Sequence, residues 1–136
     1  MAKNFEILEH PSDVKIRAFG KTKEELFVNA MLGMVAVLRP KIKDKKEKIK
    51  NKIKIESVDL NALLVDFLSE VLYQIQTKKE IYNNIKFTKL SDTELTGELT
   101  GQKIESFGED IKAVTYHGLQ IQQKNGLYEA TILFDI

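Results

Sequence analysis

The chain has 136 residues, the length of one domain, and residues 1–136 are expected to fold as a single unit with a buried core. Its hydrophobic content of 43% and charged content of 30% are typical of a soluble globular protein, and the absence of cysteine excludes disulfides, thiolate zinc sites and cysteine catalysis. No apolar run approaches the length of a membrane helix and no signal peptide opens the chain, so a cytoplasmic protein that does not bind membranes is expected.

Two short strands with a polar turn between them are predicted at the start of the chain. Phe5–Leu8 forms the first, and the alternating apolar and polar residues of Val14–Phe19 form the second. Pro11 pushes His10 into extended backbone geometry. Asp13, just before the second strand, has two interpretations. Its carboxylate accepts hydrogen bonds from the backbone amides of the turn, or it belongs to a functional site at the end of the two strands.

Two helices are predicted next. Thr22 begins the first within a capping box, and Pro40 ends it. The second runs from about Asp59 to Thr77, with one wide apolar face that packs against a sheet. Asp66 and Glu70 lie four residues apart on its polar side, where they form either a solvated helix face or a pair of metal ligands.

The net charge of +1 conceals a basic segment, residues 41–54, which carries a charge of +6 against −5 for the rest of the chain. Its lysines could contact phosphates, but it has neither arginine for bidentate phosphate binding nor aromatic residues for base stacking. Ile49, Ile53 and Ile55 recur in and just after it and the next residues keep the alternation, which predicts an edge strand that lysines protect from pairing with other chains. A protected edge of this kind favours a monomer.

The remaining segments are predicted to be strands. They are Lys48–Glu56, Asn83–Leu90, Glu94–Gly101, Ile111–Gln122 and Leu127–Ile136. The last two flank Asn125-Gly126, a strong signal for a β-hairpin. Two helices and about seven strands favour an α+β fold, with one mixed or antiparallel sheet of about six to seven strands that carries both helices on one face.

The last residues of the chain are Asp135 and Ile136, whose main-chain carboxylate follows directly. If Asp13 approaches them, three carboxylates share one place, and a divalent cation would relieve their repulsion. Oxygen ligands favour Ca²⁺, Mg²⁺ or Mn²⁺, whereas a nitrogen from His10 or His117 would shift the preference toward a transition metal. The spacing alone does not bring the two ends of the chain together.

Four blocks of sequence, in this order, resemble the archease family. They are LEHPSDVKIRAFG at 8–20, KTKEELFVNAMLGM at 21–34, DLNALLVDFLSEVLY at 59–73, and KAVTYHGLQI at 112–121 with the closing FDI at 134–136. One departure lies in the first block, where the family usually has Thr-Ala and this chain has Pro11-Ser12. The hydroxyl is thereby displaced by one position, while Asp13 keeps its place.

The resemblance implies a two-layer α+β sandwich and an accessory protein instead of an enzyme. The resemblance implies a protein that assists the tRNA-splicing RNA ligase, which joins RNA ends through a guanylated histidine and Mn²⁺. The family's function would be to promote guanylation of the ligase by GTP and multiple turnover, with any tRNA contact indirect. The resemblance also implies a metal site at Asp13, Asp135 and the carboxylate of Ile136, most expected to hold calcium, with magnesium or manganese as alternatives.

Two other functions stay open. A small metal-dependent hydrolase would use Asp13, Asp135 and His117, but the sequence has no nucleophile elbow, no phosphate-binding glycine loop and no HExxH motif. A chaperone or RNA-binding module would use residues 41–54, and its RNA binding would be salt-sensitive and lost when the lysines at 45, 46 and 48 are neutralised.

Overall fold

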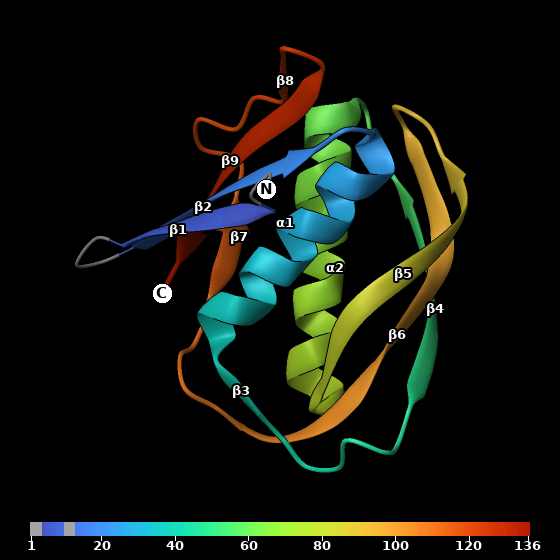
Figure 1. Ribbon diagram of the computed structural model, residues 1–136, viewed down its shortest axis with the longest axis vertical. Helices are drawn as coiled ribbons and strands as arrows, with labels where there is room; N and C mark the ends of the chain where they lie inside the picture. The colour runs from blue at the N-terminus through green and yellow to red at the C-terminus, as the bar shows by residue number, and fades with distance from the viewer. Residues whose placement is uncertain (1–3, 10–12) are drawn as a thin grey trace.

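The computed structural model describes residues 4–9 and 13–136, and Figure 1 shows their arrangement. The elements in chain order are β1 (Phe5–Glu9), β2 (Asp13–Gly20), α1 (Lys23–Leu38), β3 (Pro40–Ile42), β4 (Ile49–Glu56), α2 (Leu60–Lys78), β5 (Glu80–Leu90), β6 (Glu94–Phe107), β7 (Ala113–Thr115), β8 (Gln122–Lys124) and β9 (Leu127–Asp135). Within this described part, neither helix is long and apolar enough to cross a membrane.

The strands form two antiparallel sheets, so the prediction of a single sheet with six to seven strands is wrong. The first sheet has five strands in the order β1-β2-β9-β7, with β8 also paired to β9. The second has four strands, in which the long β6 pairs with β3, β4 and β5. The α+β class and the two helices are confirmed.

Both helices contact both sheets, so the prediction that they cover one face of one sheet is also wrong. Helix α1 packs on β1, β2 and β9 of the first sheet and on β5 of the second, while α2 packs on β7 of the first and on β4, β5 and β6 of the second (Figure 1). The helices meet at Phe27 and Phe67, whose ring centroids are 5.6 Å apart. The outer face of each sheet is therefore left free of helices.

The burial pattern of α1 explains this arrangement. Its buried residues are Leu26, Phe27, Asn29, Ala30, Met31, Gly33, Met34, Val37 and Leu38. At about 3.6 residues per turn they cover more than half of the helix circumference, which a single sheet could not bury. A second sheet on the other side removes this apolar surface from water.

The predicted helix starts are confirmed by their caps. The Thr22 hydroxyl accepts a hydrogen bond from the backbone N–H of Glu25 at 3.1 Å, and the Asp59 carboxylate accepts one from the backbone N–H of Ala62 at 2.8 Å. Each cap satisfies an N–H group that has no partner inside the helix.

The predictions for the strands near the end of the chain are partly wrong. Asn125 and Gly126 both have positive φ, 52° and 76°, as the predicted tight hairpin between β8 and β9 requires. The predicted strand Ile111–Gln122, however, is interrupted between β7 and β8. Gly118 has a φ of 67° there, a left-handed conformation that a continuous strand does not contain.

Strand β4 confirms the predicted protected edge. Among the described strands it pairs only with β6, in a register that sets Lys52 opposite Glu98. Its even-numbered residues are exposed, and its odd-numbered residues face the helices. Lysines therefore point outward along this edge, where a second chain would otherwise pair.

A polar cluster is buried inside the second sheet. The Tyr82 hydroxyl donates a hydrogen bond to Glu80 Oε1 at 2.8 Å, and Asn51 Nδ2 donates to both, at 2.7 Å to the Tyr82 oxygen and 2.8 Å to Glu80 Oε1. Tyr82 is fully buried, and burial followed by the hydrogen bond to Glu80 raises the pKa of its hydroxyl far above the usual value. The cluster links β4 to β5 on the two sides of β6.

We expect Tyr82→Phe to lower the free energy of unfolding by about 1–3 kcal/mol, because it leaves Glu80 and Asn51 with unmade hydrogen bonds in a buried place. Urea unfolding measures the change, with Tyr73→Phe as control because Tyr73 is 63% exposed. Equal effects of the two substitutions would contradict the account.

Folding raises the pKa of the Tyr82 hydroxyl. The contribution of this group to the free energy of unfolding is therefore present below about pH 10 and is lost at higher pH, because the unfolded chain ionises first.

Candidate metal site

The pairing of β2 with β9 brings Asp13 and Asp135 together. They are the first residue of β2 and the last residue of β9, and they lie directly opposite each other in the antiparallel register. Their neighbours Val14 and Phe134 are buried against the helices, so the two aspartates lie on the outer face of the sheet. Residues in this relation have Cβ atoms about 4.5–5.5 Å apart. We call Asp13 and Asp135 the acidic pair.

One oxygen of the acidic pair has no partner. Asp13 Oδ1 is buried and forms no hydrogen bond within the described part of the chain. A buried oxygen without a partner costs about 1–3 kcal/mol, and a like charge across the ladder adds repulsion. Carboxylate oxygens are the preferred ligands of Ca²⁺, Mg²⁺ and Mn²⁺, so the acidic pair fits a hard divalent cation.

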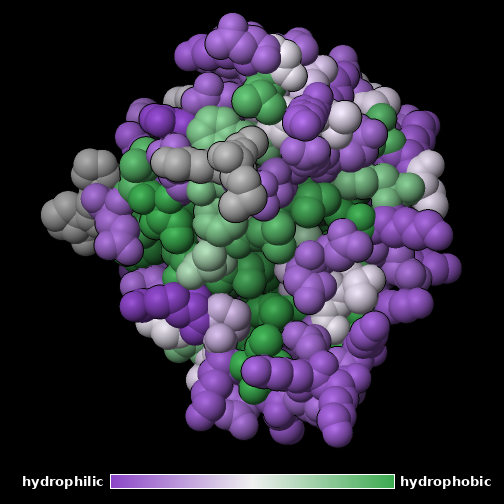
Figure 2. Space-filling view, in the orientation of Figure 1, coloured by the Kyte–Doolittle hydropathy of each residue, from purple (hydrophilic) through white to green (hydrophobic). Residues whose placement is uncertain are grey.

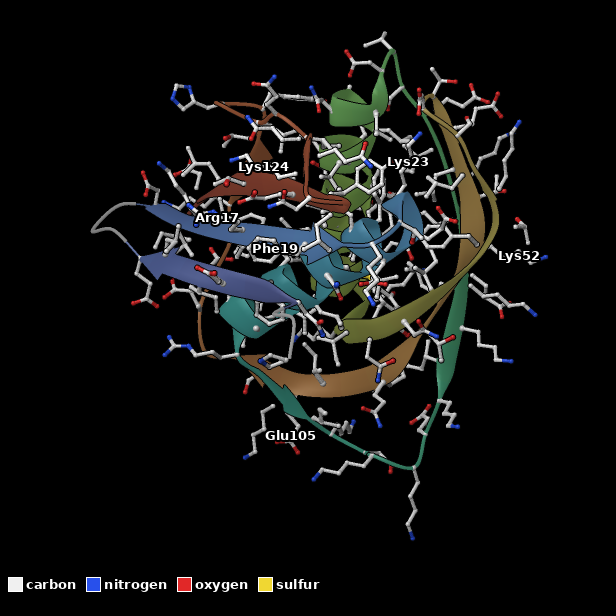
Figure 3. The ribbon with its side chains drawn as sticks, turned by 45° about the horizontal axis from the view of Figure 1, so that its top comes forward. Arg17, Phe19, Lys23, Lys52, Glu105 and Lys124 are labelled. Carbon is white, nitrogen blue, oxygen red and sulfur yellow. The ribbon has the colours of Figure 1, made fainter. Side chains whose placement is uncertain are left out.

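The acidic pair also differs from other carboxylates on this face. No ion pair joins either aspartate to a basic side chain among residues 4–9 and 13–136. Farther along the same face, Arg17 lies between two glutamates, 4.0 Å from Glu6 and 3.4 Å from Glu129 (Figure 3). Two other acidic groups of this face are thus paired with a basic side chain, whereas the described residues contain no such pair for Asp13 or Asp135.

The chain around Asp135 is held from two sides. Strand β2 pairs with it on one side, and on the other the backbone N–H of Lys112 donates to the Asp135 carbonyl at 2.7 Å while Ala113 is its register partner. Ile136, next in the chain, is half-buried against the core. The backbone therefore fixes the end of β9, which is the precondition for a site with defined geometry.

The side chains alone do not complete a metal site. In the part of the chain that the structure describes, no group of three or more His, Asp or Glu side chains is close enough together to hold an ion. The third ligand that the resemblance implies, at Ile136, is a main-chain carboxylate. His10 and Ser12 lie outside the described residues.

The structure does not bring His117 to the acidic pair. Strand β7 follows β9 only as far as Thr115, which lies opposite Leu133, and His117 is exposed in the turn that follows. Its backbone N–H donates to the Thr115 hydroxyl oxygen at 3.3 Å. The hydrolase hypothesis, which needs this histidine beside both aspartates, loses its third group.

Asp66 has a different role from either one predicted for it. Its carboxylate accepts hydrogen bonds from the Ser57 hydroxyl at 2.5 Å and from the Tyr116 hydroxyl, and the latter raises the pKa of Tyr116. Asp66 therefore ties the turn after β7 to α2 and is not free to share a metal with Glu70. The sequence does not predict the hydrogen bond from Tyr116 to Asp66, because an exposed tyrosine in a polar segment does not indicate which distant carboxylate it contacts.

Comparison with known proteins agrees with this fold. Residues 5–136 match the Archease protein family (MTH1598/TM1083). A protein archease of Thermoplasma acidophilum is 35% identical and that of Methanosarcina barkeri 33%, each alignment covering 98% of this chain and 94% and 97% of the relative. The solution structure of Methanobacterium thermoautotrophicum protein 1598 is similar, with a TM-score of 0.70 and 27% identity over 98% of this chain and 99% of that one.

A crystal structure of an archease from Thermotoga maritima, titled a possible chaperone, shares the fold with a TM-score of 0.70 at 23% identity, covering 100% of this chain and 98% of that one. The molecule is thus a small α+β protein with two antiparallel sheets around two helices and an acidic pair at a strand end. The chain belongs to the archease family. Archeases are generally non-catalytic accessory proteins linked to tRNA splicing.

We expect Asp135→Asn to raise the free energy of unfolding by about 0.2–1 kcal/mol in EDTA, because it removes one of two facing like charges. Urea unfolding measures it. Glu129→Gln is the matched control, since Glu129 lies on the same strand and face but is paired with Arg17, and its loss should leave stability unchanged or slightly lower. A lower stability for Asp135→Asn would contradict the idea that the pair is uncompensated.

Proposed function

We propose that this protein is a non-catalytic activator of the tRNA-splicing RNA ligase. It promotes guanylation of the ligase by GTP and so permits multiple turnover in tRNA splicing and RNA repair. Family membership supports the partner, and the single observation that supports a site of action is the register pairing of Asp13 with Asp135. The activator role needs no direct contact with tRNA, and in this role the protein acts as a cytoplasmic monomer.

The site that we propose holds a divalent cation through Asp13, Asp135 and the main-chain carboxylate of Ile136. Calcium is the first expectation, with magnesium or manganese as alternatives. When bound, the cation supplies positive charge between carboxylates that otherwise repel. The buried Oδ1 of Asp13, which has no partner among the described residues, is consistent with a cation at this place.

The protein's own residues give this site a fixed place that a partner can reach. The outer face of the first sheet carries no helix, because both helices lie on its other side. The Lys112 backbone holds one side of β9 and β2 holds the other. In this account the ligase meets the open end of β2 and β9, where the compensated carboxylates present an ordered surface.

Metal binding is expected to depend on each ligand. Asp13→Ala or Asp135→Ala should weaken Ca²⁺ binding in titration calorimetry by more than about 100-fold, while circular dichroism shows an intact fold. Asp44→Ala removes an exposed aspartate elsewhere and serves as the control.

Residues added after Ile136 should also weaken Ca²⁺ binding, because they convert the main-chain carboxylate into an amide. Equal affinity in the extended protein would exclude Ile136 as a ligand.

The activator role is tested by RNA ligation with a cognate ligase held well below its RNA substrate. We expect product beyond one equivalent of ligase only when the wild-type protein is added, and loss of that stimulation with Asp13→Ala but not with Asp44→Ala. Absence of stimulation at every ratio would overturn the activator role.

The protein alone, with metal and the same RNA, should release no cleaved RNA. Cleavage would favour the hydrolase hypothesis.

A further inference from the structure

A groove of about 520 Å³ lies on the outer face of the second sheet, far from the acidic pair in the fold. Its lining comes from three neighbouring strands and includes Lys52 and Lys54 of β4, Lys86 and Thr88 of β5, and Thr96 and Glu98 of β6. We call this the basic groove. Figure 3 shows Lys52 directed away from the helices, and hydrophilic side chains cover the side of the molecule that β4 and β5 form (Figure 2).

Two lysines of the basic groove share one neighbouring carboxylate. Lys52, Glu98 and Lys86 are register partners across β4, β6 and β5, so one carboxylate lies between two ammonium groups. Neither lysine forms an ion pair within the described residues. Lys54 lies 3.9 Å from Glu56, but both side chains are about two-thirds exposed, 71% and 67%, and such a pair is easily replaced. The lining of the groove thus has three lysines against one glutamate.

Hydroxyl groups add a second feature that suits an anion. The Thr88 and Thr96 Oγ1 atoms are 2.8 Å apart, close enough for one hydroxyl to donate to the other. The hydroxyl that accepts keeps its own proton for a group outside the protein. Lysines with a hydroxyl donor between them are typical contacts of phosphate oxygens.

We propose that the basic groove binds the phosphate backbone of RNA. Lys50, Lys52 and Lys54 alternate along β4 and are all exposed, with successive Cα atoms about 6.6–6.8 Å apart. A row of cations repeated along a strand suits a polyanion with repeated phosphates better than a single small anion. No lining residue of the groove is aromatic, so binding rests on charge and not on base stacking.

The groove and the acidic pair lie on the outer faces of different sheets, with the helices between them. RNA in the groove therefore leaves the acidic pair free for a protein partner. The basic groove differs from the basic segment 41–54 of the sequence analysis, because it includes Lys86, which is distant from that segment in the chain and is joined to it through β6.

The test uses a short fluorescent oligouridylate and the purified protein in EDTA, without ligase, so that its outcome is independent of the activator role. Three lysine–phosphate contacts predict a fall in affinity of about 20-fold between about 50 and 200 mM salt. The triple variant Lys52→Gln, Lys54→Gln, Lys86→Gln should bind at least about tenfold more weakly at the lower salt and lose most of the salt dependence.

Two matched variants make the result specific. The variant Lys45→Gln, Lys46→Gln, Lys48→Gln removes the same charge from the loop before β4 and should stay within about threefold of wild type. Glu98→Gln should tighten binding, since it removes the only carboxylate of the lining. Unchanged melting temperatures show that the folds are intact.

Three outcomes would overturn the groove as an RNA site. They are the absence of RNA binding by the wild type, a loop variant as weak as the groove variant, and binding of anionic lipid vesicles in place of RNA.

Discussion

The antiparallel pairing of β2 with β9 is the constraint on which the rest of the structure depends. It joins the start of the chain to its end, places Asp13 opposite Asp135, and forms the centre of the sheet on which α1 packs. Along this ladder, buried apolar pairs such as Ile16 with Ile132 alternate with pairs whose side chains point outward. A slip of one residue would expose the apolar set and separate the aspartates, so the core itself fixes the register of the site.

The position of the helices between the sheets leaves the outer face of each sheet without a helix. Because the helices are apolar over more than half of their surface, they are enclosed between the sheets and leave both outer faces open to partners. One face ends in two facing carboxylates, and the other carries the three lysines of the basic groove. In the proposed account, one face serves a metal and a protein partner, and the other face serves RNA.

The features that the sequence predicted are local ones. Thr22 and Asp59 cap helices through neighbouring backbone, Asn125-Gly126 form a turn by their own conformations, and the alternation from Ile49 needs only one strand. The two sheets, by contrast, depend on which strands pair, and no local pattern records that. The same holds for the bond from Tyr116 to Asp66 and for Lys86 beside Lys52. Asp13 and Asp135 were named from the sequence, but only the register shows that they face each other.

The most direct test of the central claim is a calcium titration followed by backbone amide resonances in a two-dimensional NMR spectrum. The account predicts saturable shifts at residues 13–15 and 133–136, with smaller changes at Lys112 and Ala113, which hold the end of β9. Resonances of β4, β5 and β6 should stay in place. No shift at these strand ends, or shifts spread over carboxylates elsewhere, would contradict a metal site at the acidic pair.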